Sequence, residues 1–279
     1  MLSPADEAFV ARHAYVPEHV PGYVTAVSAV EPHLVEDYLC YQAGETLVFI
    51  GYPLGRTSEG TDLARTISAA VARFRPRQVA LTAPALPDLT PRCEPRERDA
   101  YYRIDLASVR VPAKERSLIR RAARELRVEQ GRQLGAAHEV LTAEFLASHG
   151  VAGDARRIYE RMPAYLTGAG TARLFSAWDQ AGELAAFAVV DLGGQAYAFY
   201  QFSIRSAQRP VPGASDLLLS EVIAAVRGEG KTYLNLGLGV HGGVMRFKEK
   251  WGAETFLPYE YGVFRPRRPG LLDALLHLP

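Results

Sequence analysis

The hydrophobic pattern is clearest in the second half of the chain. Three segments rich in β-branched and aromatic residues follow one another, separated by turn residues at 179–182 and by Gly193-Gly194: Ala172–Trp178, Glu183–Asp191 and Gln195–Ile204. Short runs of this kind, joined by tight turns with glycine, are typical of antiparallel strands. The pattern therefore predicts a three-stranded meander.

The period of the pattern changes after the meander. A polar loop with Pro and Gly, Arg205–Gly213, leads to Ser215-Asp216, which we expect to cap a helix that runs to about Arg227. A short buried strand, a glycine-rich break, a short helix and a further strand are expected to follow, at Lys231–Leu236, 237–243, Met245–Trp251 and Glu254–Phe264. The predicted order is β-β-β-loop-α-β-α-β.

The first half reads as a weaker copy of this order. A hairpin, a helix and a strand are predicted at Glu36–Gln42 with Thr46–Tyr52, at Thr61–Phe74 and at Gln78–Thr82. Without gaps, Thr61-Asp62-Leu63 aligns with Ser215-Asp216-Leu217, and three later pairs also match: Ala70 with Ala224, Arg73 with Arg227 and Arg77 with Lys231. The match indicates an internal duplication. A chance match between two amphipathic helices that precede strands remains the alternative.

Two domains are therefore expected. The first spans residues 1–130 and is the more degenerate, and the second spans residues 131–279 and carries the candidate active site. A strand at Tyr101–Leu106 and a connector helix at about residues 112–128 are expected to link them. Two further helices, Ala137–His149 and Asp154–Thr167, are expected to begin the second domain.

The connector helix is rich in arginine on one side. Its apolar stripe includes Leu118 and Ala122, and the remaining surface carries Arg120, Arg124 and three more arginines. Such a face can hold phosphate oxygens of a lipid head group, a nucleotide or a tRNA. It can equally be a solvated surface, and both interpretations stay open.

Composition excludes several classes of protein. The chain has 279 residues, 48% hydrophobic content, 23% charged content and a net charge of +1, so no global field favours nucleic acid or an anionic membrane. No apolar run reaches the roughly 20 residues that span a bilayer, and the N-terminus carries acids and no signal-like core. The only cysteines, Cys40 and Cys93, are expected to be buried, and no metal cluster is evident. We expect a cytoplasmic protein with no integral membrane segment.

Lysine usage marks one short stretch. Only four of the 32 basic side chains are lysines, yet Lys248 and Lys250 stand two positions apart in Phe247-Lys-Glu-Lys-Trp-Gly252. An ammonium is a compact charge with three rotating donors, unlike the planar guanidinium. The pair therefore marks a candidate site, although a solvated helical turn explains it as well.

Three stretches together resemble a known group of enzymes. They are Gly213-Ala-Ser-Asp-Leu-Leu218, Tyr233-Leu-Asn-Leu-Gly237 and Phe247–Gly252. With the order of elements, they look like tandem GNAT-like acyltransferases, and in particular like FemAB/FemX-type aminoacyl transferases and the transferase domain of lysyl-phosphatidylglycerol synthases (the DUF2156 group). Tyr102–Leu106 and the helix after it also resemble the domain junction in those families. The resemblance implies an α+β fold of two GNAT-like domains, each a mixed, mostly antiparallel sheet flanked by helices.

The implied activity is acyl or aminoacyl transfer from an activated donor to an amine or a hydroxyl. The donor would be an acyl-CoA or an aminoacyl-tRNA, and the acceptor a small molecule or a lipid or peptidoglycan precursor. In such folds the loop before the main helix offers main-chain N–H groups to donor phosphates, which a helix N-terminus also favours. In this chain that loop would supply Arg209, Gly213, Ala214 and Ser215.

Other positions are implied by the same resemblance or follow from their chemistry. Lys248 would stabilise negative charge at the reacting centre, with Phe247 as a wall and Lys250 as a bystander. The weaker candidates are Tyr200 and Gln201 on the last meander strand, Asn235 before the glycines, and His241 as a base, since an imidazole titrates near neutral pH. An exposed loop histidine without a function is the alternative for His241.

The donor loop departs from the usual acyl-CoA pattern. Arg209-Pro-Val-Pro-Gly213 has one residue too many between Arg209 and Gly213, and its two prolines lack N–H groups. The departure is tolerable in FemAB-like proteins, whose donor is not CoA. It also favours the rival hypothesis, a non-catalytic binding or regulatory protein on a degenerate GNAT scaffold.

Overall fold

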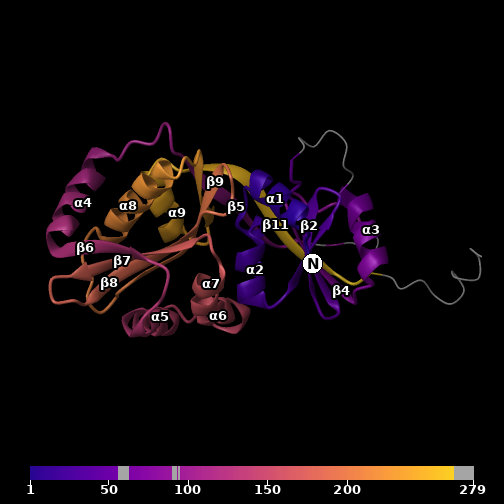
Figure 1. Cartoon of the computed structure of the whole chain (residues 1–279), viewed down its shortest axis with the longest axis horizontal. Helices are drawn as coiled ribbons and strands as arrows, with labels where there is room; N and C mark the ends of the chain where they lie inside the picture. The colour runs from indigo at the N-terminus through magenta and orange to yellow at the C-terminus, as the bar shows by residue number, and fades with distance from the viewer. Residues whose placement is uncertain (56–62, 90–92, 94, 267–279) are drawn as a thin grey trace, which may run out of the picture. The chain divides into compact units, whose positions relative to one another are not determined.

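The computed structural model describes residues 1–55, 63–89, 93 and 95–266 (Figure 1). The chain divides into two compact units that are not contiguous in sequence. The first unit contains residues 1–6, 30–99 and 258–279, and the second contains residues 7–29 and 100–257. The boundary expected between residues 130 and 131 falls inside the second unit.

The first unit is a mixed sheet with one helix. Its strand order is β1-β2-β3-β4-β11, where β3 and β4 are parallel and the other pairs are antiparallel. The helix α3 packs on this sheet around Phe49, Ile67 and Leu81, all of which are buried. The bounds are β1 Glu31–Val35, β2 Tyr38–Ala43, β3 Thr46–Ile50, α3 Leu63–Phe74, β4 Gln78–Ala83 and β11 Glu254–Phe264.

The second unit has the larger sheet, with the strand order β5-β10-β9-β8-β7-β6. Only β9 and β10 are parallel, and the other described pairs are antiparallel. The bounds are β5 Pro95–Asp105, β6 Leu126–Gly131, β7 Ala172–Asp179, β8 Leu184–Asp191, β9 Tyr197–Arg205 and β10 Tyr233–Leu238.

Helices cover both faces of this sheet (Figure 1). On one face, α8 lies across the strands with α4 packed against it and α9 beside it, around a core that includes Leu218 and Trp251. On the other face lie α5, α6 and α7, around a core that includes Tyr165 and Phe187. The bounds are α4 Ala113–Glu125, α5 Ala136–Ser148, α6 Gly153–Glu160, α7 Met162–Gly168, α8 Ala214–Gly228 and α9 Gly242–Lys250.

This double cover explains the sequence of the central strand. Every residue of β8, Leu-Ala-Ala-Phe-Ala-Val-Val-Asp, is buried, because a strand with helices on both faces has no solvent side. Its closing residue, Asp191, is fully buried and accepts hydrogen bonds from the Tyr165 hydroxyl at 2.5 Å and from the Gly193 N–H at 2.7 Å. Both carboxylate oxygens of Asp191 are thus satisfied.

Most of the N-terminal segment, residues 7–29, also belongs to the second unit. It forms α1 (Pro4–His13), the 3₁₀ turn η1 (Pro17–His19) and α2 (Pro21–Ser28). The helix α2 packs on α7 and α6, and Ala14 and Val20 pack against Phe199 of β9. Prolines at the first helical positions of η1 and α2 suit their starts, where an N–H would have no partner within the helix.

The predicted α+β class is confirmed, and so are the meander, α8, β10, α9 and β11. The connector helix predicted over residues 112–128 is wrong at its end. The helix stops at Glu125, and Leu126–Gly131 instead pairs with β7 as an edge strand, because the free edge of β7 offers hydrogen bonds that helix propensity cannot outweigh.

Two further expectations can be set against the structure. The hairpin, α3 and parallel β4 of the first unit repeat the connection of β8, β9, α8 and β10. Thr61 and Asp62 of the ungapped match lie outside the described residues. A common origin of the two halves therefore stays a prediction.

Cys40 and Cys93 are both buried, and burial raises the pKa of Cys40 to about 12. Within the described part of the chain, no helix has the length and apolarity needed to cross a bilayer.

Candidate functional site

The parallel strands β9 and β10 stop pairing partway along their length. Their last paired residues are Phe199 and Asn235, although β9 continues to Arg205 and β10 to Leu238. Each strand carries an irregularity at this point: β9 shifts register against β8 between its partners Val189 and Val190, and β10 shifts against β5 between Asn235 and Gly237. Bulges of this kind re-aim side chains and end strand pairing.

Asn235 holds the irregularity in β10. Its side chain is fully buried, its Oδ1 accepts the Gly237 N–H at 2.7 Å, and its Nδ2 donates to the Tyr15 main-chain oxygen at 2.8 Å. Gly237 has φ 75°, a conformation that favours glycine. The Asn235 amide, a candidate for binding, therefore uses both ends to fix the strand and the N-terminal segment.

Lys248 lies at the end of β10. Its side chain, carried by α9, is only 5% exposed, and Nζ donates a hydrogen bond to the main-chain oxygen of Leu238, the last residue of the strand. Nζ also lies 5.4 Å from the centre of the Tyr102 ring. A carbonyl oxygen and an aromatic face both compensate a buried ammonium, and they fix its charge beside the point where β9 and β10 diverge.

Lys250 faces a different neighbour. Its Nζ lies 2.6 Å from Oδ1 of Asp216 on α8, and the same oxygen accepts the indole N–H of Trp251 at 2.9 Å. Trp251 is fully buried, and Asp216 is 6% exposed. Asp216 therefore joins the end of α9 to the first turn of α8, and it is not the helix cap expected from Ser215-Asp216.

Gly213 is the residue that caps α8. It has φ 86°, and a Cβ atom at this position would come within 2.8 Å of the Leu118 main-chain oxygen. Glycine is thus needed for both the backbone conformation and the close approach of α4. Ala214 is buried in the core, and Ser215 is half-buried. Of the expected donor-loop residues, Gly213 and Ala214 are used for packing.

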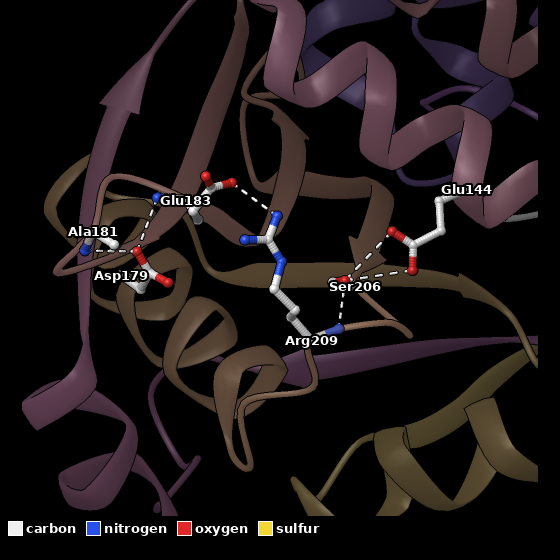
Figure 2. Close-up of polar contacts among 6 residues, drawn as sticks. All are labelled: Glu144, Asp179, Ala181, Glu183, Ser206 and Arg209. Atoms are coloured by element: carbon white, nitrogen blue, oxygen red, sulfur yellow. Dashed lines mark hydrogen bonds and ion pairs between the residues drawn. The ribbon is translucent and has the colours of Figure 1, made fainter.

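Just before the predicted donor-loop residue Arg209, the chain encloses a carboxylate from α5. Oε1 of Glu144 accepts the main-chain N–H groups of Ala207 at 2.7 Å and Gln208 at 2.9 Å. The Ser206 hydroxyl lies 3.4 Å from both carboxylate oxygens (Figure 2). The Ser206 hydroxyl oxygen in turn accepts the Arg209 N–H at 3.1 Å. Successive N–H groups that converge in this way form an anion cradle, which a side chain of the same chain fills here.

The Arg209 guanidinium points away from this cradle (Figure 2). It donates to Glu183, beside the β7–β8 turn, at 2.8 Å, and both side chains are more than half exposed. An exposed pair of this kind contributes little to stability. The Arg209 guanidinium is therefore not part of the Glu144 cradle.

The other predicted site residues differ in how far they are exposed to solvent. They are Tyr200, Gln201, His241 and Phe247. Tyr200 donates to the Ser203 hydroxyl at 3.2 Å, and burial raises its pKa to about 12. Gln201 Nε2 is buried, and it has no hydrogen-bond partner within the described residues. Phe247 is partly buried against the α8 core and lies under the Lys250 ammonium.

His241 is exposed and caps α9, where its Nδ1 accepts the Gly243 N–H at 3.2 Å. The residue before it, Val240, has φ 61°, although β-branched residues strongly disfavour this conformation. Such strain is often found beside functional sites.

Arg120 and Arg124 are exposed on α4, one helical turn apart. For their guanidinium groups no hydrogen bond or ion pair is recorded in the described part of the chain, whereas Arg121 pairs with Glu125 at 3.8 Å. The apolar side of α4, with Ile119 and Ala122, packs on the α8 core as expected. The arginine face is therefore available to an anionic ligand.

Several residues of this region could not be found from local sequence. Glu144 follows no motif, and it meets the donor loop only through the packing of α5. Glu18, in η1, lies in a segment without a clear pattern. Tyr101 and Tyr102 are adjacent in a predicted strand, so their side chains are expected on opposite faces of the sheet. This alternation is the one feature of the local sequence that bears on the position of these tyrosines.

Solved structures share this fold. The C-terminal domain (DUF2156) of a putative lysylphosphatidylglycerol synthetase from Agrobacterium fabrum matches with TM-score 0.61 and 16% identity, over 98% of this chain and 96% of that one. L-PGS from Bacillus licheniformis matches with TM-score 0.60 and 15% identity, over 98% and 95%. FemX matches with TM-score 0.65 and 12% identity, over 93% and 96%.

These matches confirm the expected resemblance in the fold. At such identities they establish the fold alone. No known family profile matches the sequence, and a comparison with curated proteins found no match.

Proposed function

We propose that this protein transfers an acyl or aminoacyl group from an activated ester or thioester to an amine or a hydroxyl, with Lys248 as the cation at the reacting centre. The observation that carries the proposal is the buried ammonium of Lys248, held by the Leu238 carbonyl beside the divergence of β9 and β10. The fold it shares with FemX and L-PGS supports the same class of reaction.

The proposed role of Lys248 follows from the charge that develops in acyl transfer. Attack on the carbonyl carbon places negative charge on its oxygen, and a preorganised cation in a site of low polarity stabilises that charge by a few kcal/mol. The Leu238 carbonyl fixes the position of the ammonium. Its charge is therefore already in place when negative charge develops on the reacting oxygen.

The donor loop favours an aminoacyl ester such as an aminoacyl-tRNA over an acyl-CoA. The N–H groups of Ala207, Gln208 and Arg209 have acceptors within the chain, and Pro210 and Pro212 have no N–H. A CoA diphosphate bound by the N–H groups of Ala207 and Gln208 would have to displace Glu144. The exposed Arg120 and Arg124 are the proposed contacts for phosphate oxygens of a tRNA, or of a lipid or peptidoglycan-precursor acceptor.

The rival function is a non-catalytic binding protein on the same scaffold. The observation that favours it is the extent to which Glu144, Arg209 and Gly213 are engaged in internal contacts. Both functions predict ligand binding, and only transfer predicts turnover. Turnover is therefore the deciding measurement.

The experiment compares wild type with Lys248→Ala and with Lys114→Ala, a control at an exposed lysine. Thermal-shift and turnover measurements use CoA thioesters, aminoacyl-tRNA and UDP-muramyl precursors. We expect all three proteins to bind the same donor, and Lys248→Ala to lose turnover by about 10²–10³-fold. Undiminished turnover in Lys248→Ala would refute the role of Lys248, and donor binding without turnover by wild type would favour the rival.

A further inference from the structure

The N-terminal segment brings a carboxyl group to the same strands from the other side. Residues 7–29 belong to the second unit, and two hydrogen bonds anchor them to it: Gln195 N–H to Ala11 O at 2.7 Å, and Asn235 Nδ2 to Tyr15 O at 2.8 Å. Asn235 is the last residue of β10 that pairs with β9. The turn η1, which follows Tyr15 and carries Glu18, is therefore anchored at the divergence.

Glu18 and Lys248 meet adjacent residues of β5. The Tyr101 hydroxyl donates to Glu18 Oε2 at 2.9 Å, and the Lys248 ammonium lies over the Tyr102 ring. Because successive side chains of a strand point to opposite faces, the carboxyl group and the ammonium lie on opposite faces of the sheet. Tyr101 also pairs with Leu238, whose main-chain oxygen accepts a hydrogen bond from Lys248. Glu18 and Lys248 therefore bond to the two residues of one β5–β10 pair.

The environment of Glu18 suits a group that exchanges protons. Burial raises the pKa of this carboxyl, and its own main-chain N–H and the Tyr101 hydroxyl oppose the rise only in part. The charge of Glu18 in turn helps to raise the pKa of Tyr23, and the other titratable neighbour on η1 is the buried His19. A partly buried carboxyl with a raised pKa is a frequent feature of catalytic sites.

Two buried carboxyl groups of this unit, those of Asp191 and Asp216, differ from the partly buried Glu18. Asp191 bonds a hydroxyl and a main-chain N–H close by, and Asp216 bonds an ammonium and an indole. Both join elements of the core and have evident structural roles. Glu18 instead lies in the turn anchored beside the divergence of β9 and β10, and it bonds Tyr101, which pairs with the last residue of β10.

We infer that Glu18 is the proton acceptor for the attacking amine or hydroxyl, working from the face opposite Lys248; the inference rests on the proposed transferase function. The Glu18 carboxylate takes a proton from the ammonium or hydroxyl of the acceptor. The freed nitrogen or oxygen forms a bond to the acyl carbon, and the bond from that carbon to the donor sulfur or oxygen breaks. The proton then passes from the carboxylic acid to the leaving thiolate or alkoxide. Where the acceptor is an amine, the nitrogen releases its second proton to solvent as the amide forms.

The experiment uses acceptors that differ in their need for a base. Hydroxylamine is mostly unprotonated at neutral pH and attacks without a base, whereas ethylamine and glycinamide must first lose a proton. Acetyl-CoA, alanyl-tRNA and lysyl-tRNA serve as donors, and the rate without protein is subtracted. The full-length proteins are wild type, Glu18→Gln and Glu7→Gln, the last a control at an exposed glutamate of the same segment.

We expect Glu18→Gln to lose about 10²–10⁴-fold in transfer to the protonated amines and to keep near wild-type transfer to hydroxylamine. Gln retains an oxygen that can accept from Tyr101, and thermal unfolding checks that the variant is folded. If Glu18→Gln is not folded, Glu18→Asp replaces it. We then expect a smaller loss of transfer to the protonated amines. Equal loss with every acceptor, or no loss with any, would overturn the inference.

The two hypotheses fail in different ways. If wild type transfers no acyl group even to hydroxylamine, the proposed function is wrong and the role of Glu18 falls with it. If wild type forms hydroxamate and Lys248→Ala does not, but Glu18→Gln behaves as wild type with all amines, only the role of Glu18 is wrong.

Discussion

The carboxylate of Glu144 lies 2.7 Å from the main-chain nitrogen of Ala207, in the loop where a GNAT-like fold is expected to hold donor phosphates. The same oxygen lies 2.9 Å from the nitrogen of Gln208. Two converging N–H groups favour any anion of suitable size. Here the Glu144 side chain acts as that anion. Whether it blocks the two N–H groups can therefore be tested with a simple anion, without knowledge of the substrate.

Glu144→Ala should free both N–H groups for an external anion. We expect the variant to bind inorganic pyrophosphate in calorimetry more tightly than wild type does, and to lose about 1–2 kcal/mol of the free energy of unfolding, because the loop loses its internal acceptor. Glu144→Gln keeps one oxygen acceptor and should lose less stability. Equal pyrophosphate binding by wild type and Glu144→Ala would show that Glu144 does not block the cradle.

The contact between Asp216 and Lys250 should matter more for stability than an ordinary surface ion pair. Lys250→Met takes one of two donors, the ammonium, away from the buried Asp216 carboxylate and leaves the Trp251 indole in the described part of the chain. We expect a loss of about 1–3 kcal/mol in urea unfolding, against almost none for Lys114→Met at an exposed position. Adding Asp216→Asn to Lys250→Met should recover part of the loss, because it removes the buried charge. Strictly additive losses would mean that the two side chains do not interact.

Gly213 and Gly228 offer a matched pair of substitutions at the two ends of α8. Gly213→Ala places a methyl group within 2.8 Å of the Leu118 oxygen at φ 86°, whereas Gly228→Ala meets nothing within 4 Å. We expect Gly213→Ala to lower the free energy of unfolding by about 1–3 kcal/mol, and Gly228→Ala to leave it unchanged or raise it by up to about 1 kcal/mol. Urea unfolding measures both, and similar effects would contradict the close approach of α4 to Gly213.

Local sequence could predict the elements that local forces decide. The meander from β7 to β9 follows from alternation and glycine turns, and α8 from its long apolar period. The end of α4 could not be predicted in this way, because Leu126–Gly131 becomes a strand only through the free edge of β7. The helix α1 is largely polar, with Val10 as its buried residue, so no hydrophobic stripe announces it.

In the candidate site, too, local sequence identifies some residues, and others come together only through the fold. Lys248 could be chosen as a candidate because lysine is rare in this chain and because the residues around it form a motif. Its neighbours Tyr102 and Leu238 come from two other elements, and the carboxyls of Glu144 and Glu18 lie more than sixty residues from the groups they bond. Contacts at that separation depend on the packing of helices and strands, which no local pattern contains.

The last prediction concerns the pH dependence of stability through His138 on α5. Its Nδ1 accepts the Gly135 N–H at 3.1 Å, so the ring proton is on Nε2, which lies 2.9 Å from the Ser176 hydroxyl. In this tautomer His138 cannot take a proton from Ser176, which excludes a serine–histidine nucleophile here. Burial lowers the pKa of His138.

The sign of the effect follows from proton uptake. As the pH falls below about 6.5, the usual histidine value, the unfolded chain binds a proton at this position that the folded chain does not, so the free energy of unfolding decreases until the pH passes the lowered pKa. For one proton the slope cannot exceed about 1.4 kcal/mol per pH unit. Above that window His138 makes no contribution to the pH dependence.

Urea unfolding of wild type and His138→Gln between pH 4 and pH 8 measures this contribution. The pKa of His33 is also lowered by burial and that of Glu18 is raised, and both effects persist in the variant. The difference between the two curves therefore isolates His138. We expect wild type to lose more stability than His138→Gln as the pH falls from 6.5, with parallel curves at higher pH. Curves that stay parallel over the whole range would mean that His138 binds a proton equally well in the folded and unfolded chains.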